Sequence, residues 1–466
     1  MMALLMFVLA CAVLLLGFPV ALTLAGVALW FGLAGVAFGA FDSATLLDFS
    51  SRLWGIFGNE TLVAVPLFIL MGVVLERARL AEDLLTALSG LARGRRGALG
   101  ITVVLVGAIL AASTGIVGAT VVTLGVLCLP AMLREGYAPT LASGTVAAAG
   151  TLGQIIPPSI VLVLLGDVLS SAYQQAQLRQ GQFSTQTVSV GDLFAGALLP
   201  GVLLVVAYVL WVWLASPPQT TEAEAELIKQ PASPSAAPEG PLAHVEAPPL
   251  GLALLSPLLL VLMVLGSILG GVATPTEAAS LGAVGSLLIA ITRRRLTWPL
   301  LRDAAHSATN MTAMVFLILI GASLFSLVFN AYGGDHLVQQ MLTDLPGGLT
   351  TALVAVMLLV FLLGFVLDFI EITFVVVPIV GPALLMLGAD PIWLGVLLGL
   401  NLQTSFLTPP FGFAMFYLRG VEPAQVATVQ IWRGAVPFIV IQLLMIALVA
   451  TVPALATALP EWLYGA

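Results

Sequence analysis

The sequence predicts an all-α polytopic membrane protein that contains two inverted-topology repeats. Three observations predict this class. Of the 466 residues, 60% are hydrophobic and 8% are charged, whereas an average soluble domain has roughly 25% charged residues. Apolar stretches long enough to cross a bilayer recur along the whole chain. The order of these stretches before residue 215 is repeated after residue 249.

The first half contains four apolar segments of single-span length, at 3–17, 20–40, 58–76 and 192–214. No Lys or Arg precedes the first of them. Phe18-Pro19 follows it, where a signal peptide would have a cleavage site of small residues. We therefore expect residues 3–17 to form an uncleaved membrane helix.

Two other segments of the first half differ from a single span. Segment 97–133 is too long for one crossing and is interrupted at residues 113–115, so we predict a re-entrant helical hairpin that turns back at mid-depth. Segment 138–170 contains Pro157-Pro158. Proline removes a hydrogen-bond donor and clashes with the preceding turn, so this segment is predicted to be a helix broken within the membrane.

Residues 215–249 separate the two halves. They are rich in Pro, Ala, Ser and Glu, a composition that cannot bury a core and is typical of a flexible linker. The sequence therefore predicts a first repeat over 1–214, a cytoplasmic linker over 215–249 and a second repeat over 250–466.

The second half repeats the elements of the first in the same order. A hairpin is predicted at 349–388, where Asp368 to Thr373 interrupt the apolar run, and a broken helix at 391–418, where Pro409-Pro410 occur. The remaining apolar segments are predicted single spans, at 250–270, 276–292, 309–330 and 424–456.

The orientation follows from the basic residues. If the hairpins do not cross and every other element does, one side holds 13 of the 15 Lys and Arg residues, and the positive-inside rule makes that side cytoplasmic. The first repeat then runs inward and the second outward, with both chain termini periplasmic. The basic residues on the predicted cytoplasmic side are Arg77, Arg79, Arg93, Arg95, Arg96, Arg134, Lys229, Arg293, Arg294, Arg295, Arg302, Arg419 and Arg433.

Helices broken at mid-depth indicate a binding site. Their free carbonyl and amide groups cannot be satisfied by lipid, so they must line a cavity that binds something polar. Residues 150–159 (GTLGQIIPPS) and 401–410 (NLQTSFLTPP) also supply hydroxyl and amide oxygens, which suit a hard cation. Kinked helices packed by small residues are the alternative for one such motif, but two matched motifs favour a site.

Charged residues within apolar segments are costly and usually functional. Asp368 and Glu371 lie at the predicted second hairpin tip, where they serve a site or fix the tip by hydrogen bonds. Two acids beside an anionic substrate require sodium or a protonated acid. Asn59 and Glu277 precede or begin apolar segments and are predicted helix caps. The three histidines fall in predicted loops: His244, His306 and His336.

Five stretches of the sequence resemble the large membrane subunit of tripartite ATP-independent periplasmic (TRAP) transporters. They are PLFILMG at 66–72, GQIIPPS at 153–159, GDLFAG at 191–196, TPTEAA at 274–279 and VPF at 436–438. The resemblance implies a sodium-coupled importer of small organic acids in the bacterial inner membrane, with an elevator mechanism. It implies two partners, a periplasmic substrate-binding protein and a small four-helix membrane subunit. No extra helices precede the first span, so we expect that subunit on a separate chain.

The resemblance also implies site residues, with Na⁺ as the coupling ion and no organic cofactor. One sodium site would use Ser113 or Thr114 with backbone oxygens of Gly153, Ile156 and Pro158. Inverted symmetry gives a second sodium site at Ser405, Thr408 and Pro410. The substrate would lie between the two hairpin tips, near Ser113, Thr114, Gly115, Asp368, Glu371, Thr373, Asn401 and Thr404.

Two departures from the family pattern bear on the substrate. Residues 171–190 form an insertion rich in Gln and Ser, predicted on the outside. Some relatives place an arginine beyond the first Pro-Pro pair, whereas Val161 to Leu165 are wholly apolar here. A substrate carboxylate would then meet hairpin amides, hydroxyls or sodium, which favours a small, rather apolar acid over a sugar acid. The insertion and the long 215–249 linker resemble a branch of the family whose members are expected to carry 2-oxo or hydroxy acids. The resemblance therefore implies a 2-oxo or hydroxy monocarboxylate, or a C4-dicarboxylate, as the substrate.

Other classes of protein are less consistent with the sequence. The chain has no His-Glu-x-x-His motif and no Walker lysine motif, so we do not expect an enzyme. The net charge of −8 leaves no basic face for nucleic acid. Cys11 and Cys128 lie in apolar runs and are expected to be small buried side chains rather than metal ligands. A self-sufficient sodium and carboxylate symporter that needs no binding protein remains the alternative.

Overall fold

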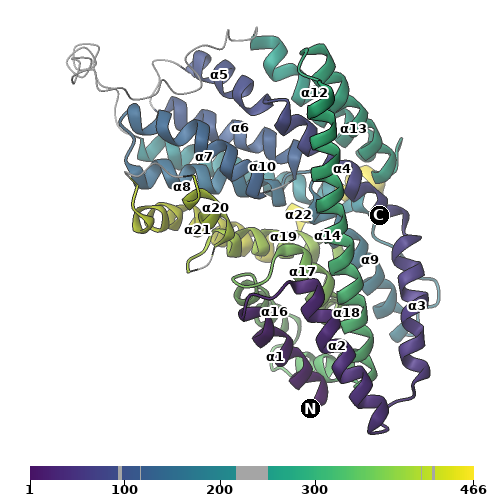
Figure 1. The fold of residues 1–466 in the computed structure, drawn as a ribbon. Helices are drawn as coiled ribbons and strands as arrows, with labels where there is room; N and C mark the ends of the chain where they lie inside the picture. The colour runs from purple at the N-terminus through teal and green to yellow at the C-terminus, as the bar shows by residue number, and fades with distance from the viewer. Residues whose placement is uncertain (93–96, 116, 217–249, 411, 422–425, 466) are drawn as a thin grey trace.

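The computed structural model describes residues 1–92, 97–115, 117–216, 250–410, 412–421 and 426–465 (Figure 1). All regular secondary structure in these ranges is helical, as the sequence predicts. The predicted linker over 215–249 lies outside the described residues from position 217 onward.

The helices of the first half follow the predicted segments closely. The hairpin segment is divided into α6 and α7, and the broken segment into α8, the 3₁₀ helix η1 and α9. Their bounds are α1 Met2–Leu15, α2 Val20–Ala37, α3 Ala44–Phe57, α4 Glu60–Arg77, α5 Leu80–Ala92, α6 Ala98–Thr114, α7 Val117–Arg134, α8 Pro139–Thr151, η1 Leu152–Gln154, α9 Ile160–Arg179 and α10 Val190–Ala215.

The second half has a similar but not identical order of elements: the single long helix α14 stands where the first half has α3 and α4, and α22 has no counterpart in the first half, so the inverted repeat stays a prediction. A short π-helix, η2, interrupts the second arm of its hairpin segment. The bounds are α12 Leu250–Leu269, α13 Pro275–Thr292, α14 Trp298–Ala331, α15 Gly334–Thr343, α16 Gly348–Leu363, α17 Phe369–Glu371, η2 Ile372–Val376, α18 Val377–Met386, α19 Pro391–Leu407, α20 Phe413–Arg419, α21 Thr428–Thr451 and α22 Ala454–Tyr464.

Several helices have no predicted counterpart. These are α3, α5 and α15, together with α22, which is separated from α21 within the predicted closing span. The loop prediction for the histidines is wrong where the structure describes them, because His306 lies in α14 and His336 in α15; His244 lies outside the described residues. Helix α9 continues to Arg179, so the first part of the predicted 171–190 insertion is helical.

The polytopic class is supported by helix length and composition. Seven described helices are long and apolar enough to cross a membrane, and α3 with α4, bent by 54°, would make an eighth. The second arms of both hairpin segments, α7 and Phe369–Met386, are among the seven. Length therefore does not distinguish a re-entrant arm from a crossing arm, and the re-entrant geometry stays a prediction.

Left-handed turns recur at matched places in the two halves. Each turn has a residue with φ between +55° and +106°, and such a φ favours glycine. Two of the matched positions hold arginine instead, Arg79 and Arg294, each with glycine at its partner position. The pairs are Gly17 and Gly271, Gly39 and Arg294, Arg79 and Gly333, Gly97 and Gly347, and Gly136 and Gly388.

Long helices from the two halves pack closely against one another and form one group. In Figure 1, α14 runs as one long helix beside α2 and α4, and α4 packs along α13, where Gly282 lies against Met71. Gly321 of α14 lies against the backbone of Ala21 in α2, an approach that a larger residue would prevent. We call α1–α4 and α12–α14 the scaffold helices.

Two predicted helix caps are confirmed. The Asn59 side chain accepts a hydrogen bond from the Thr61 N–H at 2.9 Å and caps α4. Glu277 and Thr274 form a reciprocal capping box at the start of α13. The Asn59 amide also donates to Asp167 of α9 at 2.8 Å, which joins a scaffold helix to the first broken helix.

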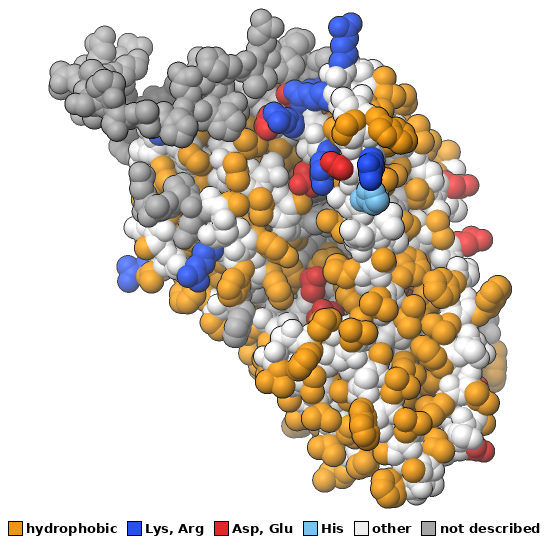
Figure 2. Space-filling model, viewed as in Figure 1, with side chains coloured by type: hydrophobic (Ala, Val, Ile, Leu, Met, Phe, Trp, Pro, Cys, Tyr) orange, Lys and Arg blue, Asp and Glu red, His pale blue; other side chains and the backbone are white. Residues whose placement is uncertain are grey.

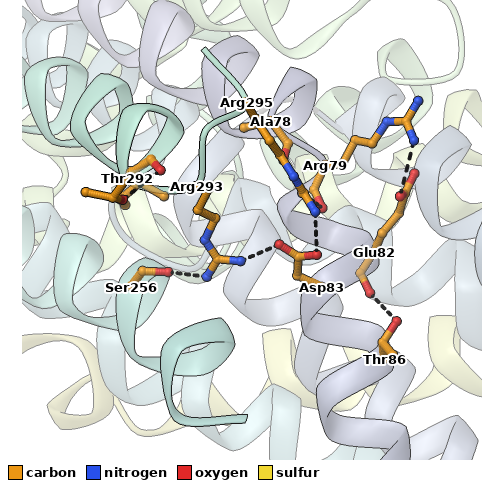
Figure 3. A network of polar contacts seen from close by, with 10 residues as sticks. Ala78, Arg79, Glu82, Asp83, Thr86, Ser256, Thr292, Arg293 and Arg295 are labelled. Atoms are coloured by element: carbon orange, nitrogen blue, oxygen red, sulfur yellow. Dashed lines mark hydrogen bonds and ion pairs between the residues drawn. The ribbon is translucent and has the colours of Figure 1, made fainter. Parts of the chain in front are cut away.

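A buried ionic network joins the two halves (Figure 3). Asp83 of α5 is 1% exposed and accepts hydrogen bonds from Arg293 and, at 2.9 Å, from Arg295. Arg293 also donates to Ser256 of α12, and Arg295 donates to the Ala78 carbonyl. The carboxylate thereby fixes the α13–α14 turn to the α4–α5 corner. Figure 2 shows basic side chains gathered in the same part of a largely hydrophobic face.

Candidate binding site at the hairpin tips and helix breaks

The first hairpin tip lies against the first helix break. Gly115 follows α6 with φ +61°, and its N–H donates to the Ala111 carbonyl at 3.0 Å. A Cβ at Gly115 would lie 3.2 Å from the Ile160 side chain, the first residue of α9. A Cβ at Gly153 in η1 would lie 3.3 Å from the Ala111 carbonyl oxygen. The two glycines therefore allow tip and break to approach backbone to backbone.

The first break is a dry, oxygen-rich turn. Residues 155–159 join η1 to α9, so the carbonyls at the end of α8 and the amides at the start of α9 lack regular helix partners. Ser113, Gly153 and Pro158 are buried, and Ile156 is half-buried against Gly201 of α10. The Ser113 hydroxyl donates to the Leu110 carbonyl at 2.9 Å. The side chain of Thr114 lies outside the described part of the chain.

The second hairpin segment also contacts its broken segment, but on the helix that precedes the break. Gly364, just after α16, lies directly against the Ser405 side chain near the end of α19. The Asn401 amide donates to the Met357 carbonyl of α16 at 2.8 Å, and the Phe369 and Phe406 ring centroids are 6.2 Å apart. The structure therefore brings Ser405 and Asn401 onto the first arm of the hairpin segment.

The second break is the more open of the two. Pro410 is exposed and Thr408 is half-buried, in contrast to the buried Pro158 of the first break. Thr408 Oγ1 donates to the Thr404 carbonyl at 2.7 Å, and Thr404 Oγ1 donates to the Leu400 carbonyl at 2.7 Å. Both hydroxyls thus keep lone pairs that could accept a further partner.

The two acids of the second tip face different neighbours. The Asp368 N–H donates to Glu371 Oε2 at 2.9 Å, and Asp368 Oδ1 accepts from the Phe369 N–H at 2.6 Å, so the pair caps α17. Glu371 is 6% exposed and borders a small apolar cavity with Phe7 of α1 and Phe325 of α14. Glu371 therefore lies where the second hairpin segment meets the scaffold helices.

Tyr417 of α20 contacts the first hairpin segment, a contact that the sequence analysis did not predict. A Cβ at Gly118, near the first hairpin tip, would lie 2.9 Å from the Tyr417 ring. Tyr417 thus joins the second broken segment to the first hairpin segment. A single aromatic residue after a Pro-Pro pair carries no pattern that would have revealed this position.

A cluster of buried amides lies where the two broken helices meet. Gln403 Nε2 lies 3.5 Å from Thr151 Oγ1, and Gln442 Nε2 donates to the Tyr208 hydroxyl at 2.7 Å. Side-chain atoms of Gln154, Gln403 and Gln442, and Thr373 Oγ1, are buried without a hydrogen-bond partner among the described residues. Native proteins leave few buried polar atoms in this state, so the region between the breaks is suited to a polar guest.

The polar groups at the two breaks are neutral oxygens. The described residues contain no group of three or more His, Cys, Asp or Glu side chains arranged to hold a metal. The predicted sodium positions offer backbone carbonyls and hydroxyls, neutral oxygens of the kind that hard cations prefer. The unpartnered Thr373 hydroxyl on the second hairpin adds a further free oxygen.

Comparisons with known proteins agree with this architecture. The family model "Tripartite ATP-independent periplasmic transporter, DctM component" matches residues 7–455. The chain is 29% identical to the C4-dicarboxylate TRAP transporter large permease protein DctM of Vibrio cholerae, over 99% of this chain and 98% of that protein. It is 26% identical to the sialic acid TRAP transporter large permease protein SiaM of the same species, over 96% of each.

A solved structure shares the fold. The crystal structure of the Alcanivorax borkumensis YdaH transporter matches with a TM-score of 0.63 and 15% sequence identity, over 94% of this chain and 98% of that chain. The two sequence relatives are transporter permease components rather than enzymes. Because the family model covers nearly the whole chain, the resemblance of the sequence is confirmed. The chain belongs to the DctM family, the large membrane component of tripartite ATP-independent periplasmic transporters.

Proposed function

We propose that this chain carries out sodium-coupled secondary active import of small organic acids by an elevator mechanism. The observation that carries the proposal is the contact of each hairpin tip with the proline break of its own half, Gly115 with Ile160 and Gly364 with Ser405. Such contacts bring free backbone groups and buried hydroxyls together inside the protein, which is the usual construction of an ion and substrate site in a secondary transporter.

The residues of each tip and break would have different roles in binding sodium and substrate. Na⁺ would be held by oxygens of Ser113 and Gly153 at the first site and of Ser405 and Thr408 at the second. A bound cation neutralises the charge of a carboxylate substrate, which can then remain in a site without arginine. Asp368 at the second hairpin tip and Tyr417, which lies against Gly118 beside the first tip, would position the rest of the substrate.

Helix packing supports a division into a scaffold and a moving part. The second arm of each hairpin segment packs on the broken helix of the other half, α7 on α20 and α18 on α9. Hairpins and breaks therefore interlock as one body that could slide along the scaffold helices. Two matched halves, whose left-handed turns recur in order, suit an opening to each side of the membrane.

The partners and the substrate follow from the family and the site. We propose that this chain lies in the bacterial inner membrane and has two partners. One is a periplasmic binding protein that delivers the substrate, and the other is a small four-helix membrane subunit on a separate chain. Val161 to Leu165 are all fully buried and apolar, which favours a small 2-oxo or hydroxy monocarboxylate, or a C4-dicarboxylate, over a large sugar acid. The alternative function is a sodium and carboxylate symporter that works alone.

Uptake into proteoliposomes tests this function. The chain would be reconstituted with its small subunit, and uptake of labelled pyruvate, lactate and succinate measured with and without a sodium gradient and with and without the binding protein. We expect uptake of at least one acid that requires both. Sodium-driven uptake without the binding protein would instead support the self-sufficient symporter. Proton-driven uptake that is indifferent to sodium would reject the cation sites at Gly153 and Ser405.

A further inference from the structure

The structure contains an apolar cavity of about 280 Å³ whose lining includes no residue of the proposed sodium or substrate sites. It lies where α1 and α14 meet α15, α16 and α18. Its lining residues are all hydrophobic, among them Phe7, Phe329, Met341, Leu359 and Ile379. This volume approaches that of small-ligand pockets, roughly 300–1,000 Å³, and is several times the roughly 30 Å³ share of a water molecule.

The mouth of the cavity opens on an exposed, apolar surface. Met341 is 56% exposed and Leu359 is 38% exposed, although both line the cavity. The surrounding face of α16 is also apolar and exposed, with Val354, Leu358 and Leu362 each more than half exposed. In a membrane protein such a surface contacts acyl chains, so the molecules that can enter the mouth are lipid tails.

Helix α15 places this mouth near one membrane surface. Its polar side is held by Arg179, which contacts Asp335 at 2.6 Å and Gln339 at 3.2 Å. Its apolar side, with Val338, Met341 and Leu342, forms one wall of the cavity. A helix with one ionic face and one apolar face lies at the boundary between headgroups and acyl chains. On the predicted orientation this boundary is the periplasmic one.

We propose that the cavity binds one acyl chain of a phospholipid from the outer leaflet. An apolar cavity does not retain water, because its walls offer no hydrogen bonds. Left empty, it loses the dispersion contacts that close packing provides. A lipid tail restores those contacts and needs no polar partner at this depth. Because the walls come from scaffold helices on one side and from the second hairpin segment on the other, the bound tail fills the seam between them.

Photolabelling of the intact complex tests the proposal. The chain, purified with its small subunit, would be reconstituted in phosphatidylethanolamine and phosphatidylglycerol vesicles. A trace of phosphatidylethanolamine would carry a diazirine near the end of one acyl chain. We expect the label to concentrate on peptides from 334–343 and 348–363. Ala355→Phe, at the exposed mouth, should fill the cavity and reduce this labelling several-fold. Val354→Phe, on the neighbouring outward position of α16, is the matched control and should leave it unchanged.

Two outcomes would overturn the proposal. One is equal labelling in the Ala355→Phe and Val354→Phe proteins, or a label spread evenly over all lipid-facing helices, because both indicate annular lipid only. The other is capture of the small subunit, rather than a lipid adduct, by a photoreactive benzophenone side chain at position 341. Met341→Trp should fill the same mouth from α15. It replaces Ala355→Phe in the labelling experiment if the Ala355→Phe protein does not fold.

Discussion

The side-chain amide of Gln403 lies 3.5 Å from the hydroxyl of Thr151, and the two residues occupy equivalent positions in the two halves. Thr151 comes six residues before Pro157, and Gln403 comes six residues before Pro409. The broken helices therefore touch at matched side chains. A local pseudo-two-fold axis that relates the two halves would pass close to this contact. A proline break and a hairpin tip would then lie on each side of the axis.

A double-mutant cycle measures this contact. Thr151→Val and Gln403→Leu each remove one partner, and at 3.5 Å the expected coupling is at the lower end for hydrogen bonds, about 0.5 kcal/mol. Thermal unfolding of the purified complex would report it. Thr145→Val is the control, because this buried hydroxyl in α8 bonds only its own helix, at the Leu141 carbonyl. A coupling of zero, with additive single effects, would show that the halves do not interact here.

Glycine at position 364 is required by the approach of Ser405. A methyl group there would collide with both the Oγ and the Cβ of Ser405, so Gly364→Ala should separate the second tip from its break and abolish most sodium-dependent uptake. Gly399→Ala in α19 is the control, since a Cβ there meets only ordinary contacts at 3.4 Å or beyond. If both variants transport like the wild type, the close tip-to-break contact is not needed for function.

The serine hydroxyls of the proposed sodium sites should set the sodium dependence. Loss of one oxygen ligand costs about 1 kcal/mol, so Ser113→Ala and Ser405→Ala should each raise the sodium concentration for half-maximal uptake about five-fold. Ser286→Ala is matched to them, because Ser286 is fully buried and bonds a carbonyl three residues back, as Ser405 does. An unchanged sodium response in Ser113→Ala and Ser405→Ala would remove these side chains from the sites.

The sequence predicts much of this architecture because the residues that interrupt its apolar segments are easy to recognise. Pro157-Pro158 and Pro409-Pro410 mark both breaks, and apolar length marks the spans. Helices α5 and α15 were missed because charged residues such as Asp83 and Asp335 interrupt their apolar pattern, and both are shorter than a span. The contacts of Gln403 with Thr151 and of Tyr417 with Gly118 join positions far apart in the chain, and no local pattern in one sequence encodes them.

Cysteine labelling tests the inverted topology. Arg294 and Gly39 hold matched left-handed turns, and opposite orientation of the repeats places these turns on opposite sides of the membrane. In a chain lacking Cys11 and Cys128, Arg294→Cys should react with a membrane-impermeant maleimide only from the cytoplasmic side. Ala40→Cys, an exposed position beside Gly39, should react in intact spheroplasts. Labelling of both from the same side would contradict the inversion.

The buried carboxylate of Asp83 should matter far more to stability than an exposed one nearby. Asp83 is 1% exposed and bonds Arg293, whose side chain is 7% exposed. Removal of one partner of a buried pair leaves an uncompensated charge, which costs about 3–5 kcal/mol. Asp83→Ala should therefore lower the thermal unfolding temperature of the complex strongly.

Asp303→Ala is the control, because Asp303 is 59% exposed and lies 3.6 Å from Arg77, and exposed pairs contribute about 0–1 kcal/mol. Replacing both Asp83 and Arg293 with apolar residues should recover part of the loss, because the buried charge of Arg293 is then absent and only Arg295, whose side chain is 29% exposed, is left without its carboxylate partner. If Asp83→Ala and Asp303→Ala destabilise the protein equally, the network in Figure 3 does not hold the α4–α5 corner to the second half.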